Sequence, residues 1–341
     1  MVAFNFNYLA KFSVGDENKT IIPATGVIAN VGSGTGGLLA ALIIESFNWR
    51  YYFYFMSAIY MLGLVSHLLF VQESLEKSWY LTDDEKEIII KSNDSKAEQT
   101  ASDQAPDTLK SGICRLYLLA FCIHNFGYAL IWYNTLNVIP FYLNKVLGAS
   151  PLLIASLNTA LCILIAVCTI VFSVLYQKLD KIMSWVECRM ILTVLPMVCQ
   201  IIFAIGMSYS NTTTGGVIIL SFCAIASSTY FSGGLVTLNY ELDPDNSALK
   251  CSIFNSFGQM AGFVGPLLMA AITNTPPDTP NYTEVYKQKW SFFFFVVAGI
   301  AAVSSLVIVL AYFLKRDEWV PFKDRKYTTE VCSAPPEVGG E

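Results

Sequence analysis

Charge is scarce in this sequence, and its absence from long stretches narrows the class of protein. Of 341 residues, 14% are charged and 54% are hydrophobic, and the mean hydropathy is +0.51. Eight stretches without an internal Lys or Arg are each long enough, at 1.5 Å per residue, to cross about 30 Å of hydrocarbon. A soluble core helix of this length would carry a charged face. The composition excludes an ordinary soluble domain and predicts an all-α, polytopic helical membrane protein.

The eight predicted spans run approximately over residues 21–45, 51–71, 116–140, 152–177, 190–209, 215–240, 251–273 and 291–314. Their orientation follows from Lys and Arg, which are retained on the cytoplasmic side of membranes. With the segment before residue 21 on that side, seventeen of these residues lie in cytoplasmic segments and four in exoplasmic ones. This distribution predicts cytoplasmic termini. It also places the sequons at Asn211 and Asn281 on the exoplasmic side, where glycosylation is possible.

Patterns for disulfides, metals and covalent catalysis are missing as well. None of the nine cysteines falls in a predicted exoplasmic loop, and neither Cys-x-x-Cys nor a His/Cys metal spacing occurs. We therefore expect no disulfide framework, no metal and no cofactor. No set of Ser/His/Asp or Cys/His residues lies in a recognisable catalytic motif, which argues against an enzyme. Nothing indicates binding to nucleic acid, and the expected surroundings are the lipid bilayer.

A polar insert separates the first two spans from the last six. Within it, Thr82 followed three residues later by Glu85 predicts a capping box at the start of a short cytoplasmic helix. Transporters built from two six-helix bundles carry a long loop between spans six and seven. We therefore predict four parts. They are residues 1–72, the remainder of an N-terminal bundle with spans five and six; 73–114, the connector; 115–316, a C-terminal six-helix bundle; and 317–341, a cytoplasmic tail.

Several motifs resemble one family of transporters. They are "FNWRYYFYF", "LTDDEKEII", "IPFYLNKVLG", "KRDEWVPF" and "LNYELDPDNSALKCSIFNSFGQMAGFVGPL". In the last of these, Asn239 and Asp243 resemble the family's N-x-x-D-x-x-P turn, and Asn255, Gly262 and Pro266 resemble its N-(x)6-G-x-x-x-P pattern. Over roughly residues 17–322 the chain is similar to the anion/cation symporter family (solute carrier family 17) of the major facilitator superfamily. That family includes sialin, vesicular glutamate transporters and type I sodium/phosphate cotransporters.

The resemblance implies a partial major facilitator fold and a secondary active transporter of organic or inorganic anions. It would work by alternating access, coupled to protons or sodium, with a small anion as its partner. The membrane would be the plasma membrane or that of a lysosome or synaptic-type vesicle. An alternative remains, because eight spans do not supply both halves around a midplane site. The chain would then be a truncated, transport-inactive membrane protein or isoform.

Five residues are candidates for the substrate site. The resemblance places Tyr128 where vesicular glutamate transporters have an arginine and sialin-like members a tyrosine, and implies that it lines the cavity. Tyr133, nearer the exoplasmic end, and Asn239 in the family-like turn are further candidates. His124 shares a helix face with Tyr128 and is either a proton relay or a histidine that hydrogen-bonds a neighbour. Asn255 either bonds another helix or contacts substrate.

Small residues gather in two of the spans. Gly258, Gly262 and Gly265 share a face of span 251–273, which predicts close packing against a neighbouring helix more than ligand contact. For Gln259 in the same span we also expect packing. Residues 32–37 superficially resemble a phosphate-binding loop, but no Lys follows them and they lie inside an apolar span. Helix packing is therefore the expected role of these glycines too.

Overall fold

The computed structural model describes residues 18–71, 78, 81–91, 112–179, 182, 184–242, 247–276 and 278–314. The predicted tail, most of the connector and Asp243 of the family-like turn lie outside the described residues. Secondary structure in the described part is helical. The helices are α2 (Asn18–Ser46), α3 (Trp49–Phe70), a short helix over residues 83–91, α5 (Gly112–Tyr133), the π-helix η4 (Asn134–Val138), α6 (Ile139–Lys145), α7 (Pro151–Leu179), α8 (Trp185–Ser208), α9 (Thr213–Gly233), α10 (Leu235–Leu242), α11 (Ser247–Thr273) and α12 (Tyr282–Leu314).

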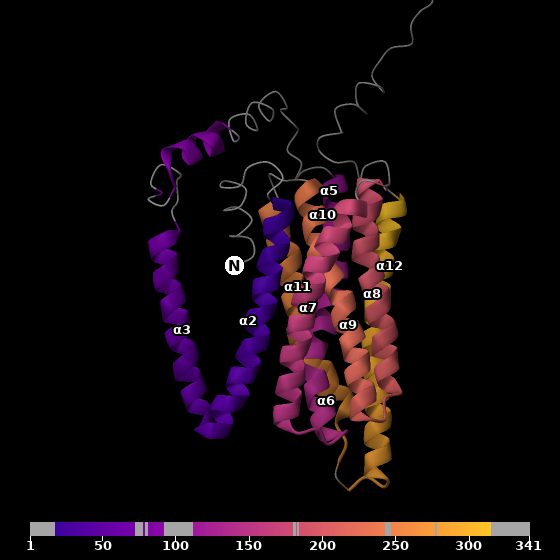
Figure 1. Ribbon diagram of the computed structural model, residues 1–341. Coiled ribbons are helices and arrows are strands. Elements are labelled where there is room, and N and C mark those ends of the chain that lie inside the picture. The colour runs from indigo at the N-terminus through magenta and orange to yellow at the C-terminus, as the bar shows by residue number, and fades with distance from the viewer. Residues whose placement is uncertain are drawn as a thin grey trace, which may run out of the picture.

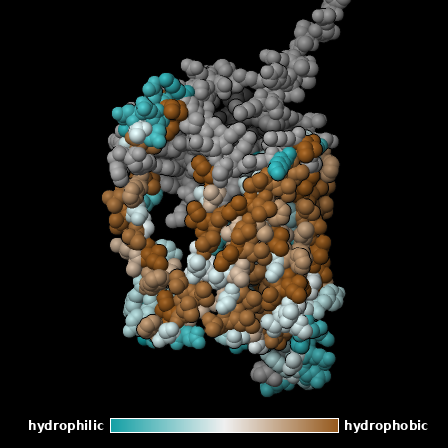
Figure 2. Space-filling view, in the orientation of Figure 1, coloured by the Kyte–Doolittle hydropathy of each residue, from teal (hydrophilic) through white to brown (hydrophobic). Residues whose placement is uncertain are grey.

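Eight helical segments in the described residues are long and apolar enough to cross a membrane, with α5 to α6 and α9 to α10 each forming one span. In hydrocarbon every backbone N–H and C=O needs a partner inside the protein, and a continuous helix supplies it. The predicted integral, multi-pass helical membrane protein is thereby confirmed. Apolar residues cover the sides of the helices, and hydrophilic residues lie nearer their ends (Figure 2).

The helices from α5 to α12 form one bundle, and α2 and α3 lie beside it (Figure 1). Within the bundle α5 packs against α11 and α12, α7 against α9, and α8 against α9 and α12. Helix α2 packs mainly against α7, whereas α3 has no buried residue and contacts the rest of the described structure mainly through α2. The assignment of α2 and α3 to a separate N-terminal bundle stays a prediction.

Two spans are irregular inside the membrane. The π-helix η4 immediately precedes α6, whose second residue is Pro140. A proline ring collides with the carbonyl four residues before it, and the wider π turn gives that carbonyl more room. The second irregularity is Gly234, which separates α9 from α10. A Cβ at Gly234 would lie 2.8 Å from the carbonyl oxygen of Tyr230, so only glycine fits this turn without movement.

The small-residue faces pack as predicted. A Cβ added at Gly258 would approach Asn125, and one at Gly262 would approach the ring of Tyr133, both on α5. On α2, a Cβ at Gly34 would lie 2.7 Å from the Cβ of Cys162 in α7, and the Thr159 hydroxyl donates to the Gly34 carbonyl over 2.8 Å. Packing is therefore confirmed for Gly34, Gly258 and Gly262, whereas a Cβ at Gly32 or Gly36 would meet nothing within 4 Å.

The predicted capping box is also present. The Thr82 backbone N–H and hydroxyl both donate to the same carboxylate oxygen of Glu85 over 2.9 Å, and the Glu85 N–H donates back to the Thr82 hydroxyl over 3.4 Å. These two donors lower the pKa of Glu85 from its ordinary value of 4.5, the backbone N–H having the larger effect. The reciprocal bonds account for the start of the helix at this point.

Candidate functional site

A polar contact region inside the bundle is formed by Asn125, Tyr128 and Tyr230, here called the tyrosine–amide cluster. The rings of Tyr128 on α5 and Tyr230 on α9 are stacked, with centroids 3.7 Å apart and planes 7° from parallel. The Tyr230 hydroxyl donates to the Asn125 side-chain oxygen over 2.7 Å. The Asn125 amide nitrogen donates to the Phe254 carbonyl on α11 over 2.9 Å. The cluster thus joins three helices.

Burial explains why these bonds form. Asn125, Tyr128 and Tyr230 are all buried, and a buried amide or hydroxyl without a partner costs about 1–3 kcal/mol. Asn125 uses both ends of its amide, which fixes which end is nitrogen and which is oxygen. The cluster can therefore hold Asn125 in one orientation and present aromatic faces and hydroxyl groups inside the membrane.

His124 lies next to this cluster and is fully buried. Its ring stacks on that of Tyr230 at a centroid distance of 6.4 Å. Backbone groups of Thr193 and Ser304 lie beside the ring, but among the described residues neither ring nitrogen has a hydrogen-bond partner of normal geometry. Both interpretations of His124, as a proton relay and as a histidine that hydrogen-bonds a neighbour, stay predictions. The prediction that His124 and Tyr128 lie close together agrees with their shared contact to Tyr230.

Tyr133 forms a second contact between α5 and α11. Its hydroxyl donates to the side-chain oxygen of Gln259 over 2.5 Å. Tyr133 lies five residues beyond Tyr128, which is about 7.5 Å along a helix. This bond is more exposed than the tyrosine–amide cluster, because Gln259 lies on the surface of the bundle. Gln259, for which packing was expected, bonds directly to a candidate site residue.

The other two candidates are not part of these contacts. Asn255 on α11 is half-buried. It follows Phe254, the partner of Asn125, and successive residues point about 100° apart around a helix. Asn239 is buried in α10, which Gly234 separates from the helix that carries Tyr230. The roles of Asn255 and Asn239 as substrate contacts stay predictions.

Two buried cations lie at the ends of helices rather than in this region. The Lys250 ammonium donates to the Tyr117 hydroxyl near the start of α11. The guanidinium of Arg189, near the start of α8, lies 3.7 Å from the centroid of the Tyr176 ring. Both cations are almost completely buried, and contact with an aromatic face is a favourable environment for a desolvated cation. The tyrosine–amide cluster itself contains no charged side chain.

Sequence reasoning missed Tyr230 as a site residue. A usable signal was present, because a tyrosine in the middle of an apolar helix needs a partner for its hydroxyl. Asn125 follows His124 in the sequence, but its partners on α9 and α11 lie 105 and 129 residues away. Among the described residues no group of three or more His, Cys, Asp or Glu could hold a metal ion. Binding here would use hydroxyl groups, amides and aromatic faces.

Comparisons with a family profile and with known proteins identify the superfamily of this chain. The sequence profile of the Major Facilitator Superfamily matches residues 24–239 and 122–331. Sialin of sheep (Ovis aries) is 23% identical in an alignment 314 positions long, and human sialin (Homo sapiens) is 23% identical in one 312 positions long; each alignment covers 86% of this chain. The chain spans 57% of the length of these curated relatives. The profile matches well over half of the chain on its own, and the chain therefore belongs to the Major Facilitator Superfamily.

Proposed function

We propose that this chain takes part in secondary active transport of small anions across a membrane, as a transporter and not an enzyme. The observation that supports the proposal most is the tyrosine–amide cluster, which gathers polar groups from α5, α9 and α11 inside the membrane of a protein with transporter relatives. Buried polar groups in a membrane protein are concentrated along substrate and ion pathways.

In this proposal substrate passes along α5. Tyr128 and Tyr133 lie about 7.5 Å apart along the helix axis. A bound oxyanion would replace Gln259 as the acceptor of the Tyr133 hydroxyl proton. Asn255 is a further contact from α11, and Asn239 a contact nearer the cytoplasmic end. Transport proceeds by alternating access, and the driving force is a gradient of protons or sodium ions. The exoplasmic sequons at Asn211 and Asn281 carry glycans.

His124 is the proposed proton site. Its imidazole is buried beside Tyr230 without a hydrogen-bond partner among the described residues. A histidine changes charge near neutral pH in water, and an intramembrane ionisable residue is a functional candidate by default. Protonation of His124 would place one positive charge next to the otherwise uncharged tyrosine–amide cluster. That charge would raise the affinity for an anion.

Counterflow in proteoliposomes tests the proposal. The purified chain is reconstituted into liposomes, which are preloaded with one anion at a time from a panel of small organic and inorganic anions. Exchange with the labelled anion outside is then measured. Tyr128→Phe keeps the stacked ring and removes one hydroxyl. Because one hydrogen bond contributes about 0.5–1.5 kcal/mol, exchange should fall roughly 2- to 10-fold. Tyr60→Phe in α3 is the matched control, since Tyr60 is exposed, and it should leave exchange unchanged.

A second candidate function is that of a membrane protein that does not transport by itself. The lack of any buried residue in α3 favours it, because that helix packs little against the other described helices. The same assay separates the two. Saturable exchange that falls in Tyr128→Phe supports transport. No exchange for any anion, from protein that is folded and correctly inserted, overturns the transport proposal for this polypeptide and supports the second candidate.

A further inference from the structure

A polar strip lies on the surface of the bundle where α5 packs against α11. It is formed by Tyr133 on α5 and by Asn255, Ser256 and Gln259 on α11, and is here called the α5–α11 polar strip. Ser256 and Gln259 are exposed, and the other two residues are half-buried. Gln259 lies near the middle of the span Leu249–Thr273. The strip is therefore close to the middle of the membrane, where transporters bind their substrates.

Gln259 has hydrogen-bond donors to spare. Its side-chain oxygen accepts the Tyr133 hydroxyl proton over 2.5 Å, and its amide nitrogen carries two further N–H groups. Within the described part of the chain this nitrogen has no hydrogen-bond partner, and neither has the Asn255 side chain. Residues four apart on a helix have Cβ atoms about 5–6 Å from each other. The two amides are therefore neighbours on one face of α11, and Gln259 offers donors there.

Lipid tails are a poor neighbour for these groups. An amide that faces hydrocarbon without a partner is costly, and polar residues in spans face the protein interior or a water-filled cavity. Because the Gln259 oxygen is already used, the groups left over on Gln259 are donors, and a ligand must supply acceptors. Neither α5 nor α11 contains an acidic residue, so a cation would find no countercharge on these helices. The strip is therefore suited to an anion.

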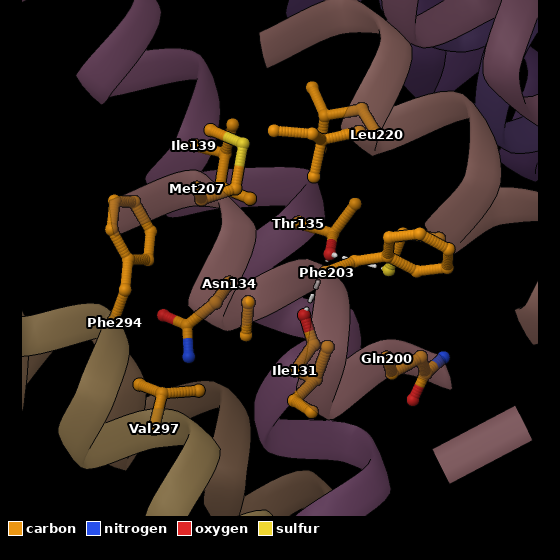
Figure 3. A pocket seen from close by; sticks show the side chains of 13 residues that line it. Ile131, Asn134, Thr135, Ile139, Gln200, Phe203, Met207, Leu220, Phe294 and Val297 are labelled. Atoms are coloured by element: carbon orange, nitrogen blue, oxygen red, sulfur yellow. Dashed lines mark hydrogen bonds between the residues drawn. The ribbon is translucent and has the colours of Figure 1, made fainter. Parts of the chain in front are cut away.

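An enclosed pocket elsewhere in the bundle is less suited to an anion. It lies where η4 meets α8, α9 and α12 (Figure 3). Its lining is mostly apolar, including Phe203, Leu220 and Val297, and contains no charged side chain. An anion moved into such surroundings would lose its hydration without gaining enough hydrogen bonds in return. The α5–α11 polar strip, by contrast, combines free N–H groups with an open surface.

We propose that Gln259 determines specificity for an oxyanion, such as a carboxylate or a phosphate, by donating its amide N–H groups to it. One oxygen of the anion takes the Tyr133 hydroxyl proton in place of the Gln259 oxygen, and the released amide turns its nitrogen towards another. The Tyr133 ring is held in place for this, since a Cβ at Gly262 would lie 3.1 Å and 3.2 Å from two ring carbons. This inference rests on the proposed function and adds a residue to its site.

A reporter cysteine tests the inference without requiring transport. Ser256→Cys lies three residues before Gln259 and is exposed. The whole protein in membranes is treated at pH 8 with N-ethylmaleimide, a neutral reagent, and mass spectrometry measures the modification of this cysteine separately from the native ones. We expect labelling, slowed at least twofold by acetate or by inorganic phosphate relative to chloride at equal ionic strength. No labelling means that the strip faces lipid or another protein and overturns the proposal, as does labelling that neither oxyanion slows.

Two substitutions separate a donor role of Gln259 from a structural one. Gln259→Glu keeps an oxygen that can accept the Tyr133 proton, but it replaces the N–H donors by a negative charge. Gln259→Leu removes donors and acceptor together. Both should abolish protection of the reporter cysteine by acetate and phosphate. Met260→Leu, at the neighbouring exposed residue, is the matched control and should retain protection. Protection that survives either substitution at Gln259 overturns the proposal.

The counterflow assay distinguishes failure of this inference from failure of the proposed function. Gln259→Leu should raise the KM for the exchanged anion roughly tenfold or more, because hydrogen bonds to charged groups are the stronger ones. Exchange with an unchanged KM retains the transport function and overturns the role of Gln259. Protection of the reporter cysteine without any exchange retains the oxyanion site and overturns transport by this polypeptide.

Discussion

Replacement of Gly258 by alanine is the most direct test of how α5 and α11 hold the tyrosine–amide cluster. The added Cβ would lie 2.4 Å from the Asn125 amide nitrogen and 3.5 Å from the Ala129 Cβ. Ordinary contact begins near 3.5 Å, so the amide must move by about 1 Å while Ala129 need not move. A shift of that size breaks the 2.9 Å bond from Asn125 to the Phe254 carbonyl and disturbs the 2.7 Å bond from Tyr230.

The size of the effect follows from these bonds. Hydrogen bonds between membrane helices contribute about 0.6 kcal/mol on average and at most about 1.7, and a buried amide left unpaired costs about 1–3 kcal/mol. Against this, alanine is favoured over glycine in a helix by about 1 kcal/mol. We therefore expect Gly258→Ala to lower the free energy of unfolding by about 1–3 kcal/mol, although it improves helix propensity.

A double-mutant cycle isolates the cause. With Asn125→Ala already present, the atom that Gly258→Ala would strike is gone. The second substitution should then be neutral or slightly stabilising. Unfolding would be followed in mixed micelles by circular dichroism. Gly36→Ala is the control, since nothing lies within 4 Å of a Cβ at that position. The reasoning is refuted if Gly258→Ala is as stable as Gly36→Ala, or if its cost is unchanged in the Asn125→Ala background.

Three further predictions concern other parts of the chain. Gly127→Ala should destabilise the bundle by about 1–3 kcal/mol, because its Cβ would lie 2.7 Å from the Cβ of a buried serine of α12. Gly299→Ala is the control and should leave stability unchanged, because its Cβ would meet nothing within 4 Å. Thermal unfolding of the two variants tests this prediction. The Glu85 carboxylate should titrate below pH 4.5 when followed by carbon-13 NMR. Because its pKa is lower in the folded protein than in the unfolded one, it stabilises the helix above the unfolded-state pKa, and this stabilisation is lost as the pH falls through the folded-state pKa. Glu85→Gln should remove this pH dependence, and a titration midpoint at the ordinary value would contradict the capping box. Asn211→Gln and Asn281→Gln should each abolish one glycosidase-sensitive mobility shift, and an unglycosylated native protein would count against the predicted sidedness.

Hydropathy was sufficient to predict the spans because lipid restricts the backbone so strongly. A segment without internal charge must satisfy its own N–H and C=O groups, and the helix is the solution open to a single segment. The same locality made the Thr82–Glu85 capping box predictable, since its partners are three residues apart. Glycine faces were predictable for a related reason. Because glycine has no side chain, a neighbouring helix can pack closely against it, and this holds whichever helix the neighbour is.

The composition of the candidate site was less predictable. Which faces of α5, α9 and α11 meet depends on helix rotation, and one sequence does not determine rotation. Tyr128 and His124 were identified, but Tyr230, whose ring lies against both, was not. The π turn at η4 also depends on how the bundle accommodates Pro140.

The distribution of charge bears on how an anion could be moved. The buried cations Lys250 and Arg189 lie near the starts of α11 and α8, and the tyrosine–amide cluster contains no charged side chain. Hydroxyl groups and amides can orient an anion, but they do not neutralise it, and carrying one charge across 100 mV changes the free energy by about 2.3 kcal/mol. A proton on His124, or a sodium ion that travels with the substrate, would cancel this term. If the cluster binds the anion as we propose, a coupled cation would supply the countercharge that the cluster lacks.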